Sequence, residues 1–148
     1  MQKPTLPRMK HDRPQPEAVV PLKQVPSPAN GTLGIVESGR DVPFEIRQVL
    51  YQYAMPANAH RGEHARYSAE ELIICIRGKL HVALESAAGM REYELASADH
   101  GIYVPPLTWV RLTTRSEDVV TVLLLSRPYD EADYIRDYAA FRAAIEQP

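Results

Sequence analysis

The feature that most constrains the fold is a series of short, strongly β-forming segments separated by turn residues. β-branched, aromatic and aliphatic residues concentrate in eight segments after the first thirty residues. The expected strands cover residues 33–37, 44–53, 71–77, 79–85, 91–95, 101–104, 108–113 and 119–126. Gly-containing turns such as Ser38 to Asp41 and Ala88-Gly89 separate them. Eight strands at this spacing favour an all-β barrel or sandwich over alternating strands and helices.

The two ends of the chain depart from this pattern. Seven of the thirteen prolines lie in the first thirty residues, so we expect residues 1–17 to form an extended or disordered arm. Residues 18–25 are expected to add an edge strand, where Pro21 is tolerated because no ladder donor is needed. Near the other end, apolar residues recur at helical spacing over residues 130–145, which predicts one helix on the outside of the barrel, capped by Asp130. The positions that form this stripe are Tyr134, Tyr138, Phe141 and Ile145.

Composition favours one small domain that recognises a small molecule. The chain has 148 residues, of which 45% are hydrophobic, so residues 18–148 can bury one core. A net charge of -2 provides no broad positive field for nucleic acid or an anionic membrane surface. Cys75 is the only cysteine, which excludes a disulfide framework and fits a reducing, cytoplasmic compartment. No apolar run has the length of a signal peptide core or a membrane span.

One polar segment stands directly before an apolar strand and carries the candidate chemistry. Residues 60–71 read HRGEHARYSAEE. His64, Arg66, Glu71 and Gly78 have the spacing of the first signature motif of cupin barrels, with Arg66 at the position of the second histidine. Residues two apart in a strand share a face, so His64 and Arg66 are expected to project together into the barrel.

The same segment argues against a metal site. A guanidinium is a poor metal ligand and a good partner for an anion or oxyanion. The second cupin motif normally ends in a histidine, and Val110 occupies that position after the tryptophan of VPPLTWV. We therefore expect no metal and no cofactor, and acid/base chemistry at His64 in their place.

Further segments carry a more specific resemblance. They are GTL at residues 31–33, VPFEI at 42–46, RGEHA at 61–65, YVP at 103–105 and above all PYDEADYIRDY at 128–138. With these segments, the chain resembles the dTDP-4-keto-6-deoxy-hexose 3,4-ketoisomerases over roughly residues 19–145. The resemblance implies a cupin (jelly-roll) β-barrel with one C-terminal helix. It also implies an isomerase of deoxysugar biosynthesis, whose products are aminated for surface polysaccharides and antibiotic sugars.

The resemblance implies roles for individual residues. Family members act without metal on a dTDP-linked sugar, moving a proton from C3 to C4 through an enediol. By position, His64 is the proton acceptor and Arg61 contacts the diphosphate, while Arg66 is expected to stabilise the enediolate electrostatically. Tyr103 completes the expected catalytic set. The further residues expected to bind substrate are Tyr51, Tyr53, Glu71 and Trp109.

The resemblance also implies assembly, and it leaves alternatives open. Family members are commonly homodimers that exchange N-terminal strands, and the proline-rich stretch before Gly31 is a plausible hinge for that exchange. One alternative function is a nucleotide-sugar 3- or 5-epimerase acting beside the same ketone. Another is a nucleotide-sugar-binding cupin without turnover. A metal-dependent cupin dioxygenase is a distant further alternative.

Overall fold

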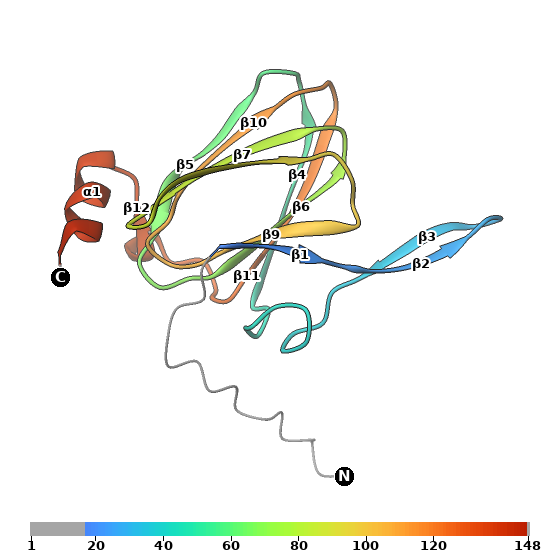
Figure 1. Cartoon of the computed structure of the whole chain (residues 1–148), viewed down its shortest axis with the longest axis horizontal. Helices are drawn as coiled ribbons and strands as arrows, with labels where there is room; N and C mark the ends of the chain where they lie inside the picture. Colours follow the sequence, from blue (N-terminus) through green and yellow to red (C-terminus); the bar gives the residue numbers. More distant parts are fainter. Residues whose placement is uncertain (1–16, 148) are drawn as a thin grey trace, which may run out of the picture.

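The protein folds as a mostly β jelly roll. The structure is a computed structural model and describes residues 17–147, so the arm expected over residues 1–17 lies, apart from Glu17, outside the described residues. Two five-stranded antiparallel sheets face each other across the core (Figure 1). In spatial order the first sheet holds β1 (Ala18–Pro21), β9 (His100–Val104), β6 (Glu71–Arg77), β11 (Val119–Leu125) and β4 (Gln48–Met55). The second holds β12 (Tyr134–Ile135), β5 (His60–Arg66), β10 (Trp109–Thr114), β7 (Leu80–Ser86) and β8 (Gly89–Leu95).

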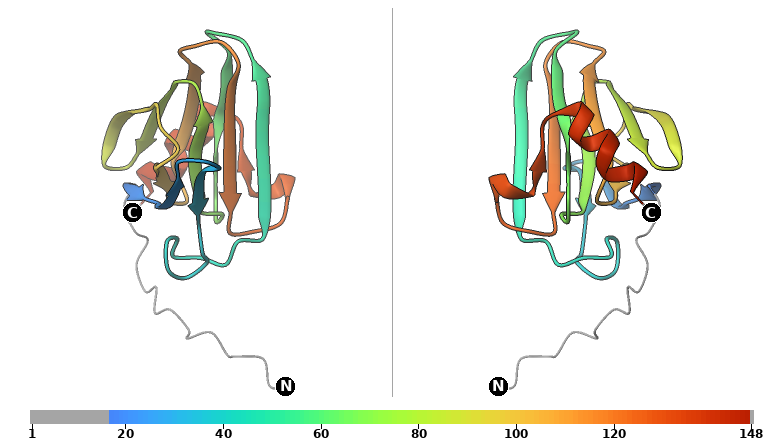
Figure 2. Two further views of the ribbon diagram at one scale, coloured as in Figure 1. Left: turned by 90° about the vertical axis from the view of Figure 1, so that its right-hand side faces the viewer. Right: turned by 90° about the vertical axis from the view of Figure 1, so that its left-hand side faces the viewer.

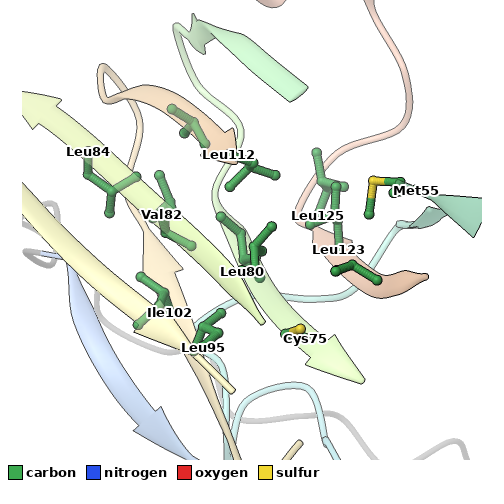
Figure 3. Packing of buried hydrophobic residues seen from close by; sticks show 14 residues of the cluster. Met55, Cys75, Leu80, Val82, Leu84, Leu95, Ile102, Leu112, Leu123 and Leu125 are labelled. Atoms are coloured by element: carbon green, nitrogen blue, oxygen red, sulfur yellow. The ribbon is translucent and has the colours of Figure 1, made fainter. Parts of the chain in front are cut away.

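The main hydrophobic core fills the space between the two sheets. Alternate residues of each strand point inward, as the pleat requires. Figure 3 shows this packing, in which Cys75 lies buried among aliphatic side chains. The fully buried residues of this core include Ile73, Leu80, Val82, Leu95, Ile102 and Val119. Since both sheets contribute, the core fixes which face of each strand looks into the barrel.

The outer face of each sheet is covered separately. On the first sheet, Val42 and Phe44 of the segment before β4 pack against Leu72 and Tyr103. On the second sheet, helix α1 (Tyr138–Glu146) lies across the strands (Figure 2), and its Phe141 is fully buried. The expected all-β barrel with one external C-terminal helix is therefore confirmed.

The N-terminal region forms two strands where the sequence predicts one. The residues predicted as one edge strand, 18–25, break at Leu22, whose N–H donates to the Asp99 carbonyl. β1 forms the edge of the first sheet beside β9, as predicted. β2 (Lys23–Ser27) pairs instead with β3 (Gly31–Ile35), and this hairpin projects away from the barrel (Figure 1).

The predicted helix is wrong in its first half. Asp130 caps only a short 3-10 turn, η1 (Glu131–Asp133), and α1 begins at Tyr138 behind a second cap, Asp137, whose carboxylate accepts from the Ala140 N–H at 3.1 Å. Between the two lies β12, which adds to the edge of β5. The backbone groups of that edge need partners, and a two-residue strand supplies them where a helix would not. No helix within residues 17–147 is long and apolar enough to cross a membrane.

Candidate active site

A β-bulge in β5 aims the candidate residues into the barrel. β5 pairs with β10 in the register Arg61 to Leu112 and His64 to Val110, with Glu63 as the extra residue. Val110 and Leu112 belong to the main core, and directly opposed residues share a face. Residues three apart would face opposite ways in a regular strand, whereas the bulge turns Arg61 and His64 to the same inner face.

The bulge depends on Gly62. Its φ angle is +84°, in the left-handed region, and the next residue, Glu63, also has a positive φ of +60°. A β-carbon on Gly62 would lie 2.6 Å from the Val110 carbonyl oxygen, which is backbone and has no free rotation to escape. Only glycine therefore allows β5 and β10 to approach this closely. Glu63 points outward to Arg111, whose Nε donates to Oε1 at 2.7 Å.

His64 is held as a neutral imidazole, and within residues 17–147 its Nε2 makes no hydrogen bond. Its Nδ1 lies 3.0 Å from the Gly62 carbonyl oxygen. A carbonyl only accepts, so Nδ1 carries the proton and the lone pair is on Nε2. Burial, and then the positive charge of Arg66, lower the pKa of His64 to about 4. The ring is therefore uncharged near neutral pH and able to accept a proton at Nε2.

Arg66 and Glu71 form a buried ion pair next to His64. Nη1 of Arg66 donates to Oε2 of Glu71 at 2.7 Å, and the exposed fractions of the two side chains are 7% and 4%. Nη2 of Arg66 donates to the Tyr134 hydroxyl at 3.3 Å. Nε is buried and has no hydrogen-bond partner within residues 17–147. The pair fixes a positive charge at a defined place inside the barrel.

Tyr134 completes this cluster, although the sequence pattern predicts a helical packing role for it. β12 sets Tyr134 directly opposite Arg66. Its ring meets the His64 ring edge-on at 4.9 Å between centroids. The guanidinium carbons of Arg66 and Arg136 lie 4.8 Å and 4.4 Å from the Tyr134 centroid, within cation–π range. Period-two alternation in Tyr134-Ile135-Arg136, with a buried Ile135 between two polar residues, is the signal that indicates a strand there.

A hydrogen-bonded cluster of Tyr129, Glu131 and Arg136, from the segment that leads into α1, flanks Tyr134. Arg136 donates twice to Glu131, at 2.6 and 2.9 Å, and the Tyr129 hydroxyl donates to the same carboxylate at 2.6 Å. The hydrogen bonds from Arg136, which have the larger effect, and from Tyr129 lower the pKa of Glu131 to about 2. The Tyr129 ring lies 5.9 Å from that of Tyr134. The segment thus holds Tyr134 against β5 by polar contacts that the sequence spacing does not reveal.

Two residues expected at the site lie on the outer faces of the sheets. Tyr103 packs against Phe44 outside the first sheet and donates to Glu70 at 2.7 Å. Burial and this bond raise the pKa of the Tyr103 phenol. Trp109 lies outside the second sheet, 5.4 Å from Tyr138 and 5.5 Å from Phe141 between ring centroids. Neither is brought to His64 in this structure.

Two further expected residues point outward from β4. Tyr51 and Tyr53 stack at 6.1 Å and are 69% and 68% exposed. The structure therefore groups His64, Arg66 and Glu71 with Tyr134, sets Arg61 on the same inner face at the exposed end of β5, and separates the other expected residues from them. Within residues 17–147, no three His, Cys, Asp or Glu side chains are grouped so as to hold a metal ion.

Comparison with known proteins supplies a family for this geometry. Residues 17–146 match the family model FdtA, described as WxcM-like, C-terminal. TDP-4-oxo-6-deoxy-alpha-D-glucose-3,4-oxoisomerase of Aneurinibacillus thermoaerophilus is 34% identical over 117 residues, 79% of this chain and 84% of that protein.

Solved structures show the same likeness. The sugar 3,4-ketoisomerase QdtA of Thermoanaerobacterium thermosaccharolyticum, in complex with TDP, is 28% identical with a TM-score of 0.82, covering 88% of this chain and 94% of that chain. A variant of QdtA has been solved with TDP-4-keto-6-deoxyglucose. The TDP-quinovose 3,4-ketoisomerase WlaRB of Campylobacter jejuni is 29% identical with a TM-score of 0.79, covering 84% of this chain and 95% of that chain.

Proposed function

The chain belongs to the FdtA family and is a sugar 3,4-ketoisomerase of deoxysugar biosynthesis, and from this premise we propose that its substrate is a dTDP-linked 4-keto-6-deoxy sugar and its base is His64. The observation that carries the role of His64 is its geometry: a neutral imidazole on the inner face, with Nδ1 tied to Gly62 and Nε2 free. The dTDP sugar is supported by the relatives, among which QdtA binds TDP and TDP-4-keto-6-deoxyglucose.

The proposed reaction moves the ketone by way of an enediol. Nε2 of His64 removes the proton from C3, and the C–H electron pair forms the C3=C4 double bond while the C4 carbonyl electrons move onto O4. The same nitrogen then returns the proton to C4 as the ketone forms at C3, while the O3 hydroxyl proton passes to O4. Arg66 is a fixed positive charge beside His64, and such preorganised charge stabilises a developing oxyanion.

The substrate is proposed to enter past the exposed end of β5. Arg61 shares the inner face with His64 and is itself exposed, so its planar fork is available to a diphosphate. Glu71 is held by Arg66, so we propose that it acts on the substrate indirectly by fixing that guanidinium. No step in this scheme uses Tyr103 or Trp109, because both lie on outer faces.

We propose that the protein is a homodimer built on β4 and on the β2–β3 hairpin. In the described part of the chain, β4 ends the first sheet and the hairpin pairs with no other strand. The apolar residues exposed on these elements are Val25, Leu33, Val49, Tyr51 and Tyr53. An uncovered apolar strand edge is a pairing site, and exchange of the hairpin between protomers would cover it. A cytoplasmic location is proposed from the single free cysteine and the nucleotide-sugar substrate.

The test is an NMR time course with a dTDP-4-keto-6-deoxy sugar in heavy water. The wild type is expected to put deuterium on the sugar and to move the ketone to C3. His64→Asn is expected to do neither. His60→Asn makes the same substitution at an exposed residue of the same strand and is expected to keep wild-type rates. Full exchange in His64→Asn would contradict the assignment. Inversion at C3 or C5 without ketone migration would indicate an epimerase, and binding without exchange would indicate a protein that has lost turnover.

A further inference from the structure

We propose that Tyr134 is the second proton carrier of this enzyme, moving a proton between the two sugar oxygens while His64 moves one between the two carbons. The inference rests on the proposed function and deepens it. Moving a ketone from C4 to C3 relocates two protons, one bound to carbon and one bound to oxygen. His64 accounts for the first, and a group next to it with an exchangeable proton is needed for the second.

Tyr134 lies where such a group must be. Its ring contacts the His64 ring at 4.9 Å between centroids. It stands opposite Arg66 across the β12–β5 pair, on the face that carries His64. Both rings are only partly buried, so a sugar at the barrel mouth is able to reach them. Within residues 17–147, the Tyr134 hydroxyl accepts one hydrogen bond and donates none, which leaves its proton free for a substrate oxygen.

The hydrogen-bond partner distinguishes Tyr134 from the other tyrosines with bonded hydroxyls. Tyr103, Tyr129 and Tyr138 each donate to a carboxylate. A carboxylate partner favours the protonated phenol, so these three are poor proton carriers. Tyr134 instead accepts from the Arg66 guanidinium at 3.3 Å, an arrangement that stabilises the phenolate formed when the proton leaves.

The two carriers together balance the reaction. In the first half, His64 takes the C3 proton, the C3=C4 bond forms, and Tyr134 gives its phenolic proton to O4. This produces a neutral enediol, an imidazolium and a phenolate. In the second half, the phenolate takes the proton from O3, the O3 electrons form the C3 ketone, and C4 takes the proton from His64. Both side chains return to their starting states, and no co-reactant is needed.

Besides supplying its charge, Arg66 then has a second role as a positioning residue that acts through Tyr134. Glu71 holds the guanidinium at 2.7 Å, and both side chains are almost wholly buried. Arg66 therefore stays in place while Tyr134 alternates between phenol and phenolate. After burial, its charge is the second factor that keeps His64 neutral before the reaction begins.

The test compares Tyr134→Phe with Tyr138→Phe in the full chain. Phenylalanine keeps the ring on His64 and within cation–π range of the two guanidinium groups, so only the hydroxyl is lost. Tyr138→Phe is the matched control, since the Tyr138 hydroxyl contacts Glu85 on the outer face. Two rates are measured in heavy water with a dTDP-4-keto-6-deoxy sugar: deuterium exchange at C3 and migration of the ketone. TDP binding and the melting temperature check that each variant is folded.

For Tyr134→Phe, ketone migration is expected to fall by roughly 10²- to 10⁴-fold, the usual contribution of a proton carrier. C3 exchange should fall much less, because His64 remains, so the ratio of exchange to migration rises at least about tenfold. Tyr138→Phe should change neither rate. Migration at the wild-type rate in Tyr134→Phe, or an equal fall in both rates, overturns the proposal. If the wild type itself neither exchanges nor isomerises the sugar, the proposed function fails, and with it the role of Tyr134.

Discussion

Arg66 and Glu71 meet at 2.7 Å inside the barrel, where the first cupin motif would otherwise supply a second histidine. Both side chains are almost wholly buried, so each charge depends on the other. The pair turns a position associated with metal binding into a permanent positive charge. The stability and the chemistry of the site therefore depend on one contact.

Removing Glu71 is expected to destabilise the fold strongly. Glu71→Ala leaves the Arg66 charge buried without its partner, which costs about 3–5 kcal/mol in free energy of unfolding. Glu45→Ala breaks the exposed pair with Arg47 and should cost less than about 1 kcal/mol. Urea denaturation of both variants measures the difference. Similar costs for the two would show that the buried pair does not form in solution.

The pH dependence of stability should report the state of His64. Its pKa of about 4 in the folded protein lies below the usual 6.5 because of burial and Arg66. Between these values the unfolded chain binds a proton that the folded chain does not, so the free energy of unfolding falls as the pH drops through this window. Relative to His64→Asn, the wild type should lose on the order of 1–3 kcal/mol between neutral pH and about pH 4, allowing for partial solvent screening. Equal losses in the two proteins would contradict the lowered pKa.

The same pKa sets the acid limit of catalysis. In the proposed mechanism His64 must be neutral to accept the C3 proton, so kcat/KM should hold steady down to mildly acidic pH and decline only near pH 4, provided the fold persists. A kinetic profile in overlapping buffers, with circular dichroism as a folding check, measures this limit. A decline centred on the ordinary histidine pKa would mean that His64 is hydrated in the free enzyme.

The bulge in β5 is tested by Gly62→Ala. The new β-carbon would meet the Val110 carbonyl at 2.6 Å, so β5 must move and take His64 with it. We expect a loss of more than about 2 kcal/mol in stability and at least a tenfold fall in activity. Gly39→Ala is the control: Gly39 has a similar φ of +79° with nothing within 4 Å of its added β-carbon, and should cost about 1 kcal/mol without affecting activity. Equal effects would show that backbone strain alone matters.

The proposed dimer is tested on β4. Tyr53→Glu places a charge on the exposed apolar face and should raise the dimer dissociation constant at least about tenfold, a cost of roughly 1.4 kcal/mol or more. Met90→Glu introduces the same charge on β8 of the other sheet, at an apolar residue of comparable exposure, and should leave the dimer dissociation constant unchanged. Sedimentation velocity over a range of protein concentrations measures the dimer dissociation constant of each variant. A wild type that stays monomeric at high concentration would disprove the dimer.

Most of the fold is predictable from the sequence because burial and turns recur with a regular period. Strand β6 runs from Glu71 to Arg77 as expected, since its apolar run is bounded by a polar motif and a glycine turn. The predicted helix is wrong in its first half because Tyr134, Tyr138 and Phe141 fit a helical period while Asp130 and Asp137 both offer caps. Which cap starts the helix depends on the open edge of β5, a long-range condition that local spacing does not contain.

The site is predictable only in part, for the same reason. The spacing of His64 and Arg66 places both on one face, but the bulge that adds Arg61 follows from close contact between two strands. Tyr103 and Trp109 are buried aromatic residues near the motifs, yet strand alternation turns them to the outer faces. Tyr134 reaches His64 only through β12, whose pairing has no local signature beyond three alternating residues.

The two-residue strand β12 has a consequence for how the enzyme matures. Until it docks, the edge of β5 is open and the His64 ring lacks its tyrosine neighbour. Any folding intermediate without β12 would have a barrel but a hydrated, ordinary histidine. On the proposed roles of His64 and Tyr134, catalytic competence requires β12 to be docked on β5, so activity during refolding should not appear before that docking.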